Sequence, residues 1–366
     1  MGLSLNNYNL FVIKKLKISW ILSCIQFPLY LTSKIIPKKE IFLYGSMNGY
    51  CIADNSKYHY LNNLNKKKFF ILNNKKNYNY FKKIGYNVIL SKSFKGIWLQ
   101  LISKHIYWTH GLRDFIPYLV AGGKVTGLQH GAPIKKGGKA RERHILKKKE
   151  GFIKKLKLTI RNFIYFIAPY TNNQHCDITI CGEKKFKEYV KEVFEYSNPN
   201  IKEDMLPRIE YAPKRVKENF ILYAPTHRGY QSIDQTLKDI NFDFQKIKNL
   251  LKEVDFKLYI RPHPLDLNNQ IIKQISKNNN DIIKIDKDED LYSKLNSFKL
   301  VVTDFSSIYQ DSIWLNIPVN TVSTDLELYN KEYGLFDWYI REIEYSNFID
   351  FEKCIKSFLF NEKKNH

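Results

Sequence analysis

Hydrophobic residues along this chain gather in short runs, and longer segments with apolar positions at helical spacing separate the runs. The runs are rich in β-branched and aromatic residues and too short for helices, which is typical of buried strands. Strands that alternate with helices at this spacing predict an α/β fold with parallel sheets. The predicted strands cover residues 41–45, 69–72, 87–90, 105–108, 124–128, 220–223, 256–260, 282–285, 300–303 and 318–322.

Helices are predicted between the strands, and Asp54 and Ser56 are residue types that cap the first of them. The predicted helices cover residues 54–64, 77–84, 97–102, 183–195, 289–295 and 348–360. A further helix is predicted in the stretch 135–161, where Lys and Arg recur and the interleaved apolar residues fall on one face. A membrane surface with anionic headgroups and a packed linker between domains both fit such a basic amphipathic helix, and the net charge favours the membrane.

The N-terminal segment has a related pattern. Its uncharged stretch, residues 18–33, lies between lysines and is shorter than the roughly 20 residues that span a bilayer. Trp20, Phe27 and Tyr30 suit an interfacial membrane helix, and a helix packed on the protein itself is the alternative. A signal peptide is disfavoured because no small-residue cleavage site follows.

Composition narrows the choice of partners. The chain has 366 residues, enough for about two domains, and a net charge of +23. Such a charge favours an anionic partner, which can be nucleic acid, anionic lipid or a phosphorylated substrate. We expect no nucleic-acid partner, because no RNA- or DNA-binding motif is present and the densest basic band lies on the amphipathic helix. The five cysteines are irregularly spaced without zinc-like pairs, which indicates reduced thiols in a cytoplasmic protein.

Polar residues follow the predicted strands of the second half, at the strand ends where open α/β sheets bind ligands. This set is rich in cationic groups and hydroxyls and poor in carboxylate pairs, so it suits a diphosphate and predicts no metal site. Each residue taken alone also has a structural explanation, such as a helix cap or a rigid turn. The set comprises Thr226, His227, Arg228, Arg261, His263, Asp304, Ser306, Ser307 and Asp311, and all of these except His227 are predicted as site residues. Asp304 stays open between a turn-former and a support for its loop.

In the first half, His130 follows a predicted strand and precedes Gly131. A histidine, with an ordinary pKa near 6.5, can take a proton from a hydroxyl at neutral pH. His110, which is followed by Gly111, competes for the same role.

Several motifs occur in a fixed order: His130-Gly-Ala-Pro-Ile-Lys-Lys136, Pro207-Arg208, Tyr223-Ala-Pro-Thr-His-Arg228, Arg261-Pro-His-Pro264 and Thr303-Asp-Phe-Ser-Ser307 with Asp311. This ordered set resembles the CDP-glycerol glycerophosphotransferase family, the teichoic-acid primases and polymerases that also act in capsule synthesis. The resemblance implies a GT-B-like architecture, with two Rossmann-like domains facing across a cleft. It also implies transfer of a polyol phosphate, most simply glycerol phosphate, from a CDP-polyol to an acceptor hydroxyl, with release of CMP.

Carried over from the family, His130 is the expected base and His263 a second essential histidine near the donor phosphates. Ser306 and Ser307 are expected to bind the diphosphate, and Asp311 a hydroxyl of the donor. The expected acceptor is lipid-linked or a polysaccharide, and no cofactor is expected. Peripheral attachment to the cytoplasmic face of the cell membrane is typical of the family, and both basic apolar segments fit it.

The resulting division of the chain has four parts. They are a membrane-associating segment (1–40), an N-terminal Rossmann-like acceptor domain (41–138), a basic amphipathic linker (139–172) and a C-terminal Rossmann-like nucleotide-donor domain with a closing helix (173–366). The alternative function is a GT-B glycosyltransferase that uses a nucleotide sugar for surface polysaccharide, since it would share the fold and the phosphate site.

Overall fold

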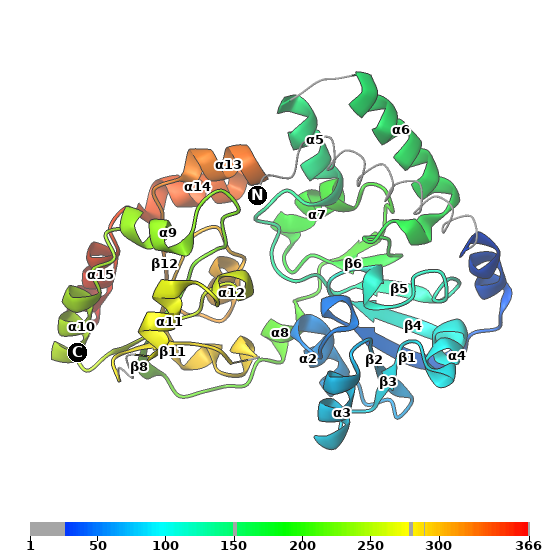
Figure 1. Cartoon of the computed structure of the whole chain (residues 1–366), viewed down its shortest axis with the longest axis horizontal. Helices are drawn as coiled ribbons and strands as arrows, with labels where there is room; N and C mark the ends of the chain where they lie inside the picture. The colour runs from blue at the N-terminus through cyan, green and yellow to red at the C-terminus, as the bar shows by residue number, and fades with distance from the viewer. Residues whose placement is uncertain (1–25, 149–151, 278–280, 289, 365–366) are drawn as a thin grey trace. The chain divides into compact units, whose positions relative to one another are not determined.

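The computed structural model describes residues 26–148, 152–277, 281–288 and 290–364 (Figure 1). These residues form two compact units. The first comprises the described residues of Met1–His130, Lys149–Ile180 and Phe194–Lys202, and the second those of Gly131–Lys148, Cys181–Val193 and Glu203–His366. Each unit is built on its own parallel sheet, so the predicted α/β class with two parallel sheets is confirmed.

The first unit contains a seven-stranded sheet in the order β3-β2-β1-β4-β5-β6-β7. Its strands are β1 (Lys39–Gly45), β2 (Lys68–Leu72), β3 (Val88–Leu90), β4 (Ser103–Trp108), β5 (Lys124–Gly127), β6 (Ile178–Ile180) and β7 (Asn200–Lys202). The helices α2 (Asp54–Asn62), α3 (Lys75–Lys83) and α4 (Phe94–Ile102) connect the first strands. Side chains such as Tyr44, Phe70 and Leu72 are buried between sheet and helices, as strands covered on both faces require.

The second unit contains a six-stranded sheet in the order β10-β9-β8-β11-β12-β13. Its strands are β8 (Glu218–Ala224), β9 (Lys257–Ile260), β10 (Ile283–Ile285), β11 (Phe298–Thr303), β12 (Val319–Val322) and β13 (Asn347–Phe348). Its longer helices are α7 (Lys187–Phe194), α10 (Phe244–Glu253), α11 (Gln270–Lys277), α13 (Leu326–Tyr333), α14 (Asp337–Ser346) and α15 (Phe351–Lys364), and the shorter ones are α8 (Pro207–Glu210), α9 (Ile233–Asp239) and α12 (Ile308–Trp314). The central strands β9, β8 and β11 lie side by side, so their carboxyl ends share one sheet edge.

Two segments lie in a different unit from the one that the sequence analysis gave them. β6 and β7 follow residue 173, yet they extend the first sheet through the pairing of β6 with β5. Residues 131–138 precede the predicted linker, yet they belong to the second unit. Ile134 lies in its core, and the Lys136 N–H donates to the Gly334 carbonyl at 2.9 Å. The local pattern of hydrophobic residues does not predict contacts between segments so far apart in the chain.

The predicted basic helix is present as α5 (Gly138–Lys148) and α6 (Phe152–Ile167). Residue 289 of the predicted helix at 289–295 lies outside the described part of the chain, and the rest of that stretch lies in two 3₁₀ turns, Leu291–Ser293 and Leu295–Ser297. Of the N-terminal segment, residues 1–25 lie outside the described part of the chain, and residues 26–35 are helical. This helix packs on the first unit, because the Ser33 hydroxyl donates to the Leu119 carbonyl and the Tyr30 ring contacts the Tyr170 ring at 4.9 Å between centroids.

Candidate active site

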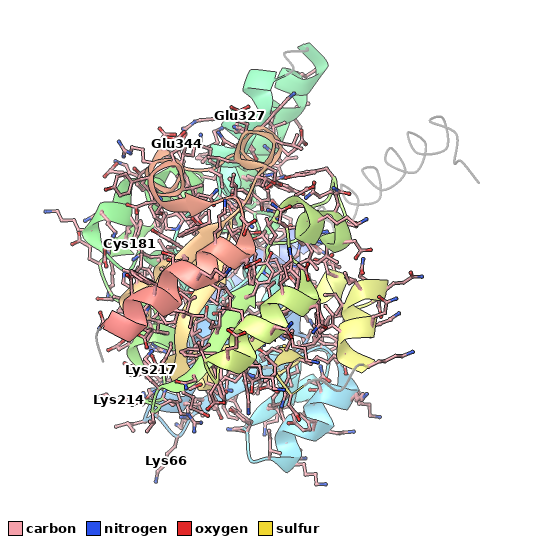
Figure 2. All side chains as sticks on the ribbon, turned by 90° about the vertical axis from the view of Figure 1, so that its left-hand side faces the viewer. Lys66, Cys181, Lys214, Lys217, Glu327 and Glu344 are labelled. Atoms are coloured by element: carbon pink, nitrogen blue, oxygen red, sulfur yellow. The ribbon has the colours of Figure 1, made fainter. Side chains whose placement is uncertain are left out.

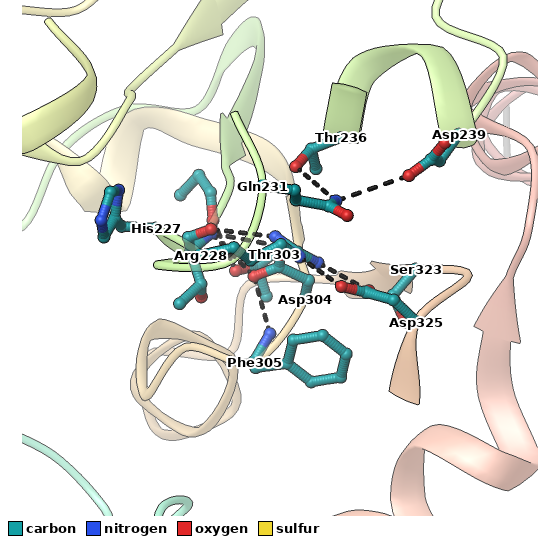
Figure 3. Close-up of polar contacts among 12 residues, drawn as sticks. His227, Arg228, Gln231, Thr236, Asp239, Thr303, Asp304, Phe305, Ser323 and Asp325 are labelled. Carbon is teal, nitrogen blue, oxygen red and sulfur yellow. Dashed lines mark hydrogen bonds and ion pairs between the residues drawn. The ribbon is translucent and has the colours of Figure 1, made fainter. Parts of the chain in front are cut away.

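Asp304 joins the ends of β8 and β11 (Figure 3). Its carboxylate is fully buried and accepts hydrogen bonds from the Thr226 N–H at 2.9 Å and the Phe305 N–H at 2.7 Å. The Arg228 Nη1 donates to it at 2.8 Å. A buried carboxylate with three such donors is well satisfied. The structure therefore favours the second sequence interpretation of Asp304, a support for its loop.

Arg228, like Asp304, is buried, and it makes hydrogen bonds to two carboxylates. Its Nε and Nη2 donate to the two carboxylate oxygens of Asp325 at 2.6 and 3.0 Å, and only 1% of its side chain is exposed. Burial alone would lower the pKa of Arg228, but the negative charges of Asp304 and Asp325 raise it above its ordinary value. This guanidinium fixes the loop after β8, and Asp325 is a partner that sequence reasoning missed.

Asp311 takes part in a second buried ion pair. Its Oδ2 accepts from the Arg208 Nη2 at 2.5 Å and from the Tyr292 hydroxyl at 2.5 Å. The Arg208 guanidinium lies over the Tyr292 ring, 4.4 Å from its centroid. The carboxylate predicted to bind a donor hydroxyl thus orients Arg208, the second residue of the Pro207-Arg208 motif.

Gly131 lies directly against the loop that carries Ser306 and Ser307. A Cβ atom added to Gly131 would stand 2.2 Å from the Ser307 Oγ and 3.1 Å from the Arg208 Nη2. Its φ of 144° is also a value that side chains disfavour. Since His130 precedes Gly131 in the chain, one peptide bond connects the predicted base to the serine loop.

His263 stacks on His227, with ring centroids 5.4 Å apart. The His227 Nδ1 is 2.9 Å from the Asp266 Oδ1, and the His263 Nδ1 accepts from the Leu265 N–H at 3.2 Å. Burial lowers the pKa of His263, and the neighbouring charge of His227 lowers it further. The neutral ring then carries its proton on Nε2 and can donate it to a phosphate oxygen.

The atoms of His227, His263 and Asp266 lie within 4.8 Å of one another, so among the described residues this group has the composition of a metal site. The hydrogen bond from the Leu265 N–H occupies the His263 Nδ1 lone pair, and its Nε2 then bears the proton. That tautomer suits a proton donor better than a metal ligand.

Arg261 and Lys135 contribute positive charge at this edge of the second sheet. Arg261 donates to Asp286 at 2.7 Å, and a quarter of its side chain is exposed, so it can reach a ligand. Lys135 is 5.5 Å from the Tyr329 ring centroid. Burial lowers the pKa of Lys135 to about 8, against the opposing charge of Asp304. Lys135 lies in the motif that begins at His130, but it was not among the site residues predicted from the sequence.

His130 lies in the first unit, exposed, two residues after Leu128 and stacked on His110 with ring centroids 5.5 Å apart. The other predicted site residues lie in the second unit, after β8, β9 and β11. There Thr226, Arg228 and Asp304 are in direct contact, while Arg261, His263 and Asp311 each have a separate partner.

The comparison with protein families tests the resemblance that the ordered motifs predicted. The chain matches the model described as CDP-Glycerol:Poly(glycerophosphate) glycerophosphotransferase over residues 29–344. The chain belongs to this family. The resemblance predicted from the ordered motifs is thereby confirmed.

Individual relatives of this family show how far the similarity extends. The teichoic acid glycerol-phosphate primase of Bacillus subtilis (strain 168) is 34% identical over 126 residues, which are 34% of this chain and 30% of that relative. The structure of the wall teichoic acid polymerase TagF has a TM-score of 0.63 at 17% identity, covering 93% of this chain and 84% of TagF. A TagF variant soaked with CDPG gives a TM-score of 0.61 at 18% identity, with the same coverage. At these identities the structural likeness shows a shared fold.

Proposed function

We propose that this protein transfers glycerol phosphate from CDP-glycerol to a hydroxyl of a lipid-linked or polysaccharide acceptor and releases CMP. Membership of the glycerophosphotransferase family supports the reaction type. The observation that carries the assignment to these residues is the contact of Gly131 with Ser307, since it ties His130 to the serine loop.

The second unit is suited to bind the donor diphosphate. Arg261 and Lys135 supply positive charge, His263 supplies an N–H, and Ser306 and Ser307 supply hydroxyls. The Thr226 Oγ1 is buried and has no hydrogen-bond partner among the described residues, which suits a further contact to the ligand. Arg228, Asp304 and Asp311 do not contact the donor in this proposal. Their buried hydrogen bonds fix the positions of the loops that do.

The proposed reaction is an in-line displacement at the β-phosphorus of CDP-glycerol. His130 accepts the proton of the acceptor hydroxyl, and the oxygen attacks the phosphorus. The bond between that phosphorus and the bridging oxygen breaks, and CMP leaves with the electron pair. The cationic groups and hydroxyls listed above offset the negative charge that moves onto CMP. The residues of this chain thus supply proton transfer, orientation and charge stabilisation.

A panel of donors distinguishes this function from the alternative. The purified protein would be incubated with CDP-glycerol, CDP-ribitol and several nucleotide sugars together with a lipid-linked acceptor. We expect CMP from a CDP-polyol, and no nucleoside diphosphate from any sugar donor. Release of a nucleoside diphosphate from a nucleotide sugar, with no CMP from CDP-polyols, would establish the glycosyltransferase instead.

The charge of Lys135 should set an alkaline limit to donor binding. With a pKa lowered to about 8, the ammonium group is mostly charged at pH 7 and loses its proton as the pH rises through 8. The KM for CDP-glycerol should therefore rise above about pH 8. Lys135→Arg should move this rise to higher pH, because guanidinium stays charged. Lys135→Met should raise the KM roughly tenfold already at pH 7, the value of one hydrogen bond to a charged group. Identical pH profiles for all three proteins would exclude this role.

Helix α6 is proposed to lie on an anionic membrane surface. Leu156, Ile160, Phe163 and Ile167 follow helical spacing on one face, and between 39% and 62% of each is exposed. Exposed lysines such as Lys66 and Lys214 project from the ribbon (Figure 2), and the net charge of +23 complements anionic lipid. None of the described helices is both long and apolar enough to cross a bilayer. In this proposal the enzyme works at the cytoplasmic face of the cell membrane.

Liposome binding tests this surface. The double variant Ile160→Glu/Phe163→Glu should bind anionic liposomes at least tenfold more weakly in co-sedimentation, since burying each side chain is worth about 1.5–3 kcal/mol. Leu64, which is 95% exposed outside this helix, provides the control Leu64→Glu, which should bind like the wild type. If the double variant bound the liposomes as tightly as Leu64→Glu and the wild type do, α6 would not be part of the membrane contact.

A further inference from the structure

Three titratable side chains meet at the carboxyl end of the first sheet. His110 follows β4, His130 follows β5, and Asp54 begins the helix after β1, and these three strands are neighbours. The two imidazole rings are stacked at 5.5 Å between centroids with an interplanar angle of 20°. The His110 Nε2 is 4.0 Å from the Asp54 Oδ2. Of these three residues, the reaction proposed above assigns a function to His130 alone.

The hydrogen bonds of His110 define what its Nε2 can do. The Met47 N–H donates to the His110 Nδ1 at 3.2 Å, so the neutral ring carries its proton on Nε2. At 4.0 Å this N–H is too far from the Asp54 carboxylate for a direct hydrogen bond. A hydroxyl oxygen about 2.8 Å from each of the two atoms fits between them, accepting from the N–H and donating to the carboxylate. The pair is spaced for one hydroxyl group.

Hydrogen bonds to one carboxylate, that of Asp114, hold the loop that carries His110 and the loop that precedes Asp54. Asp114 is fully buried, and its carboxylate accepts from the N–H groups of Asn48 at 2.7 Å, Thr109 at 3.2 Å and His110 at 3.2 Å. Burial raises the pKa of Asp114 to about 6, against these hydrogen bonds and the charge of His110. The loop after β1 and the loop after β4 are therefore fastened to one carboxylate.

Backbone strain concentrates at the same sheet edge. Several residues here that are not glycine have a positive φ, a conformation that costs roughly 1–3 kcal/mol each and recurs at functional sites. They are Met47 at 51°, Asn48 at 54°, Asp54 at 60° and Gln129 at 59°. The Gln129 carbonyl also accepts from the Asn55 side chain at 2.8 Å, which links the loop before His130 to α2.

We propose that His110 and Asp54 bind one hydroxyl of a vicinal diol on the acceptor and thereby present the neighbouring hydroxyl to His130. The bound hydroxyl keeps its proton, while the reacting hydroxyl gives its proton to His130. This inference rests on the proposed function and adds two positioning residues, His110 and Asp54, for an acceptor end that carries two adjacent hydroxyls, as a terminal glycerol unit does.

Two conservative variants isolate this contact. In His110→Asn the amide oxygen can still accept from the Met47 N–H, but the Nε2–H is gone. In Asp54→Asn the residue still tolerates a positive φ and can accept from the Asn55 N–H at 2.8 Å, but its carboxylate charge is lost. The matched control is His105→Asn on the same strand β4, where His105 pairs with the exposed Glu40. Thermal melting confirms that each variant is folded, and Asp54→Asn carries the test if His110→Asn does not fold.

The measurement compares a diol acceptor with the same acceptor lacking the second hydroxyl. For the wild type and for His105→Asn, removing that hydroxyl should raise the acceptor KM about tenfold. His110→Asn and Asp54→Asn should raise the KM for the diol acceptor by a similar factor and should no longer distinguish the two acceptors. The KM for CDP-glycerol should stay within about twofold in every variant.

The outcomes separate this inference from the proposed function. Variants that still discriminate between the two acceptors as the wild type does would overturn the diol site while leaving the transferase intact. Equal losses of kcat on both acceptors would also overturn it, since they indicate a role without contact to the second hydroxyl. No CMP from CDP-glycerol with the wild type and any acceptor would refute the proposed function, and the diol site would fall with it.

Discussion

Replacing His130 with alanine should lower CMP release from CDP-glycerol by a factor of about 10²–10⁴, the usual contribution of a positioned general base. His130 is exposed at the end of the first sheet, so its removal leaves no buried cavity. The loss should therefore appear in kcat, with the melting temperature and the affinity for CDP-glycerol unchanged. Steady-state kinetics and calorimetric titration with the donor would measure both.

His105→Ala is the control for this variant, since it removes another partly exposed imidazole from the same unit, where it pairs with Glu40. It should retain full CMP release. A folded His130→Ala protein with wild-type CMP release would remove His130 from the mechanism. His110, stacked on His130, would then be the first residue to test as the base.

Replacing Arg228 with methionine should destabilise the protein by about 3–5 kcal/mol, because it leaves Asp304 and Asp325 buried without their cation. Urea denaturation followed by circular dichroism would measure the change in the free energy of unfolding. Arg215→Met is the matched control, since Arg215 is exposed, and should change stability by less than about 0.5 kcal/mol. A loss below about 1 kcal/mol for Arg228→Met would contradict the structural role of this ion-pair network.

The pH dependence of this defect has a defined sign. In the wild type, burial raises the pKa of Asp325, but its hydrogen bonds to Arg228 outweigh burial and hold the pKa below its ordinary value. That carboxyl group contributes stability above its unfolded pKa and loses it as the pH falls. Without Arg228, burial favours the protonated state of the Asp325 carboxyl group. The difference between variant and wild type should thus be largest near pH 7 and smaller near pH 5.

The strands of both sheet centres could be predicted because they are continuous apolar runs, as at Leu300–Thr303, where every side chain is buried. β6 and β7 were missed; β7 is mostly polar, and β6 has only three residues, Ile178–Ile180, with a threonine in the middle. Their place in the first sheet depends on pairing with β5, which lies about 50 residues earlier in the chain. Tertiary contacts of this kind leave no periodic signal.

The candidate residues could be predicted as a set, because polar groups after parallel strands gather at one sheet edge. Their individual roles could not. Arg228 has the composition of a phosphate ligand, but its partner Asp325 comes 97 residues later and binds the guanidinium in two places. Asp311 likewise orients Arg208 from 103 residues away. Whether an arginine meets a ligand or a buried carboxylate depends on such distant partners.

The most direct test of the proposed transfer is to follow the β-phosphorus of the donor. The purified protein would receive CDP-glycerol labelled with ³²P at the β-phosphate, together with a lipid-linked acceptor. We expect the label to enter the acceptor as a phosphodiester and the released CMP to carry none. Label found in a released nucleoside diphosphate, with none in the acceptor, would show that the other bond is broken and would contradict the account.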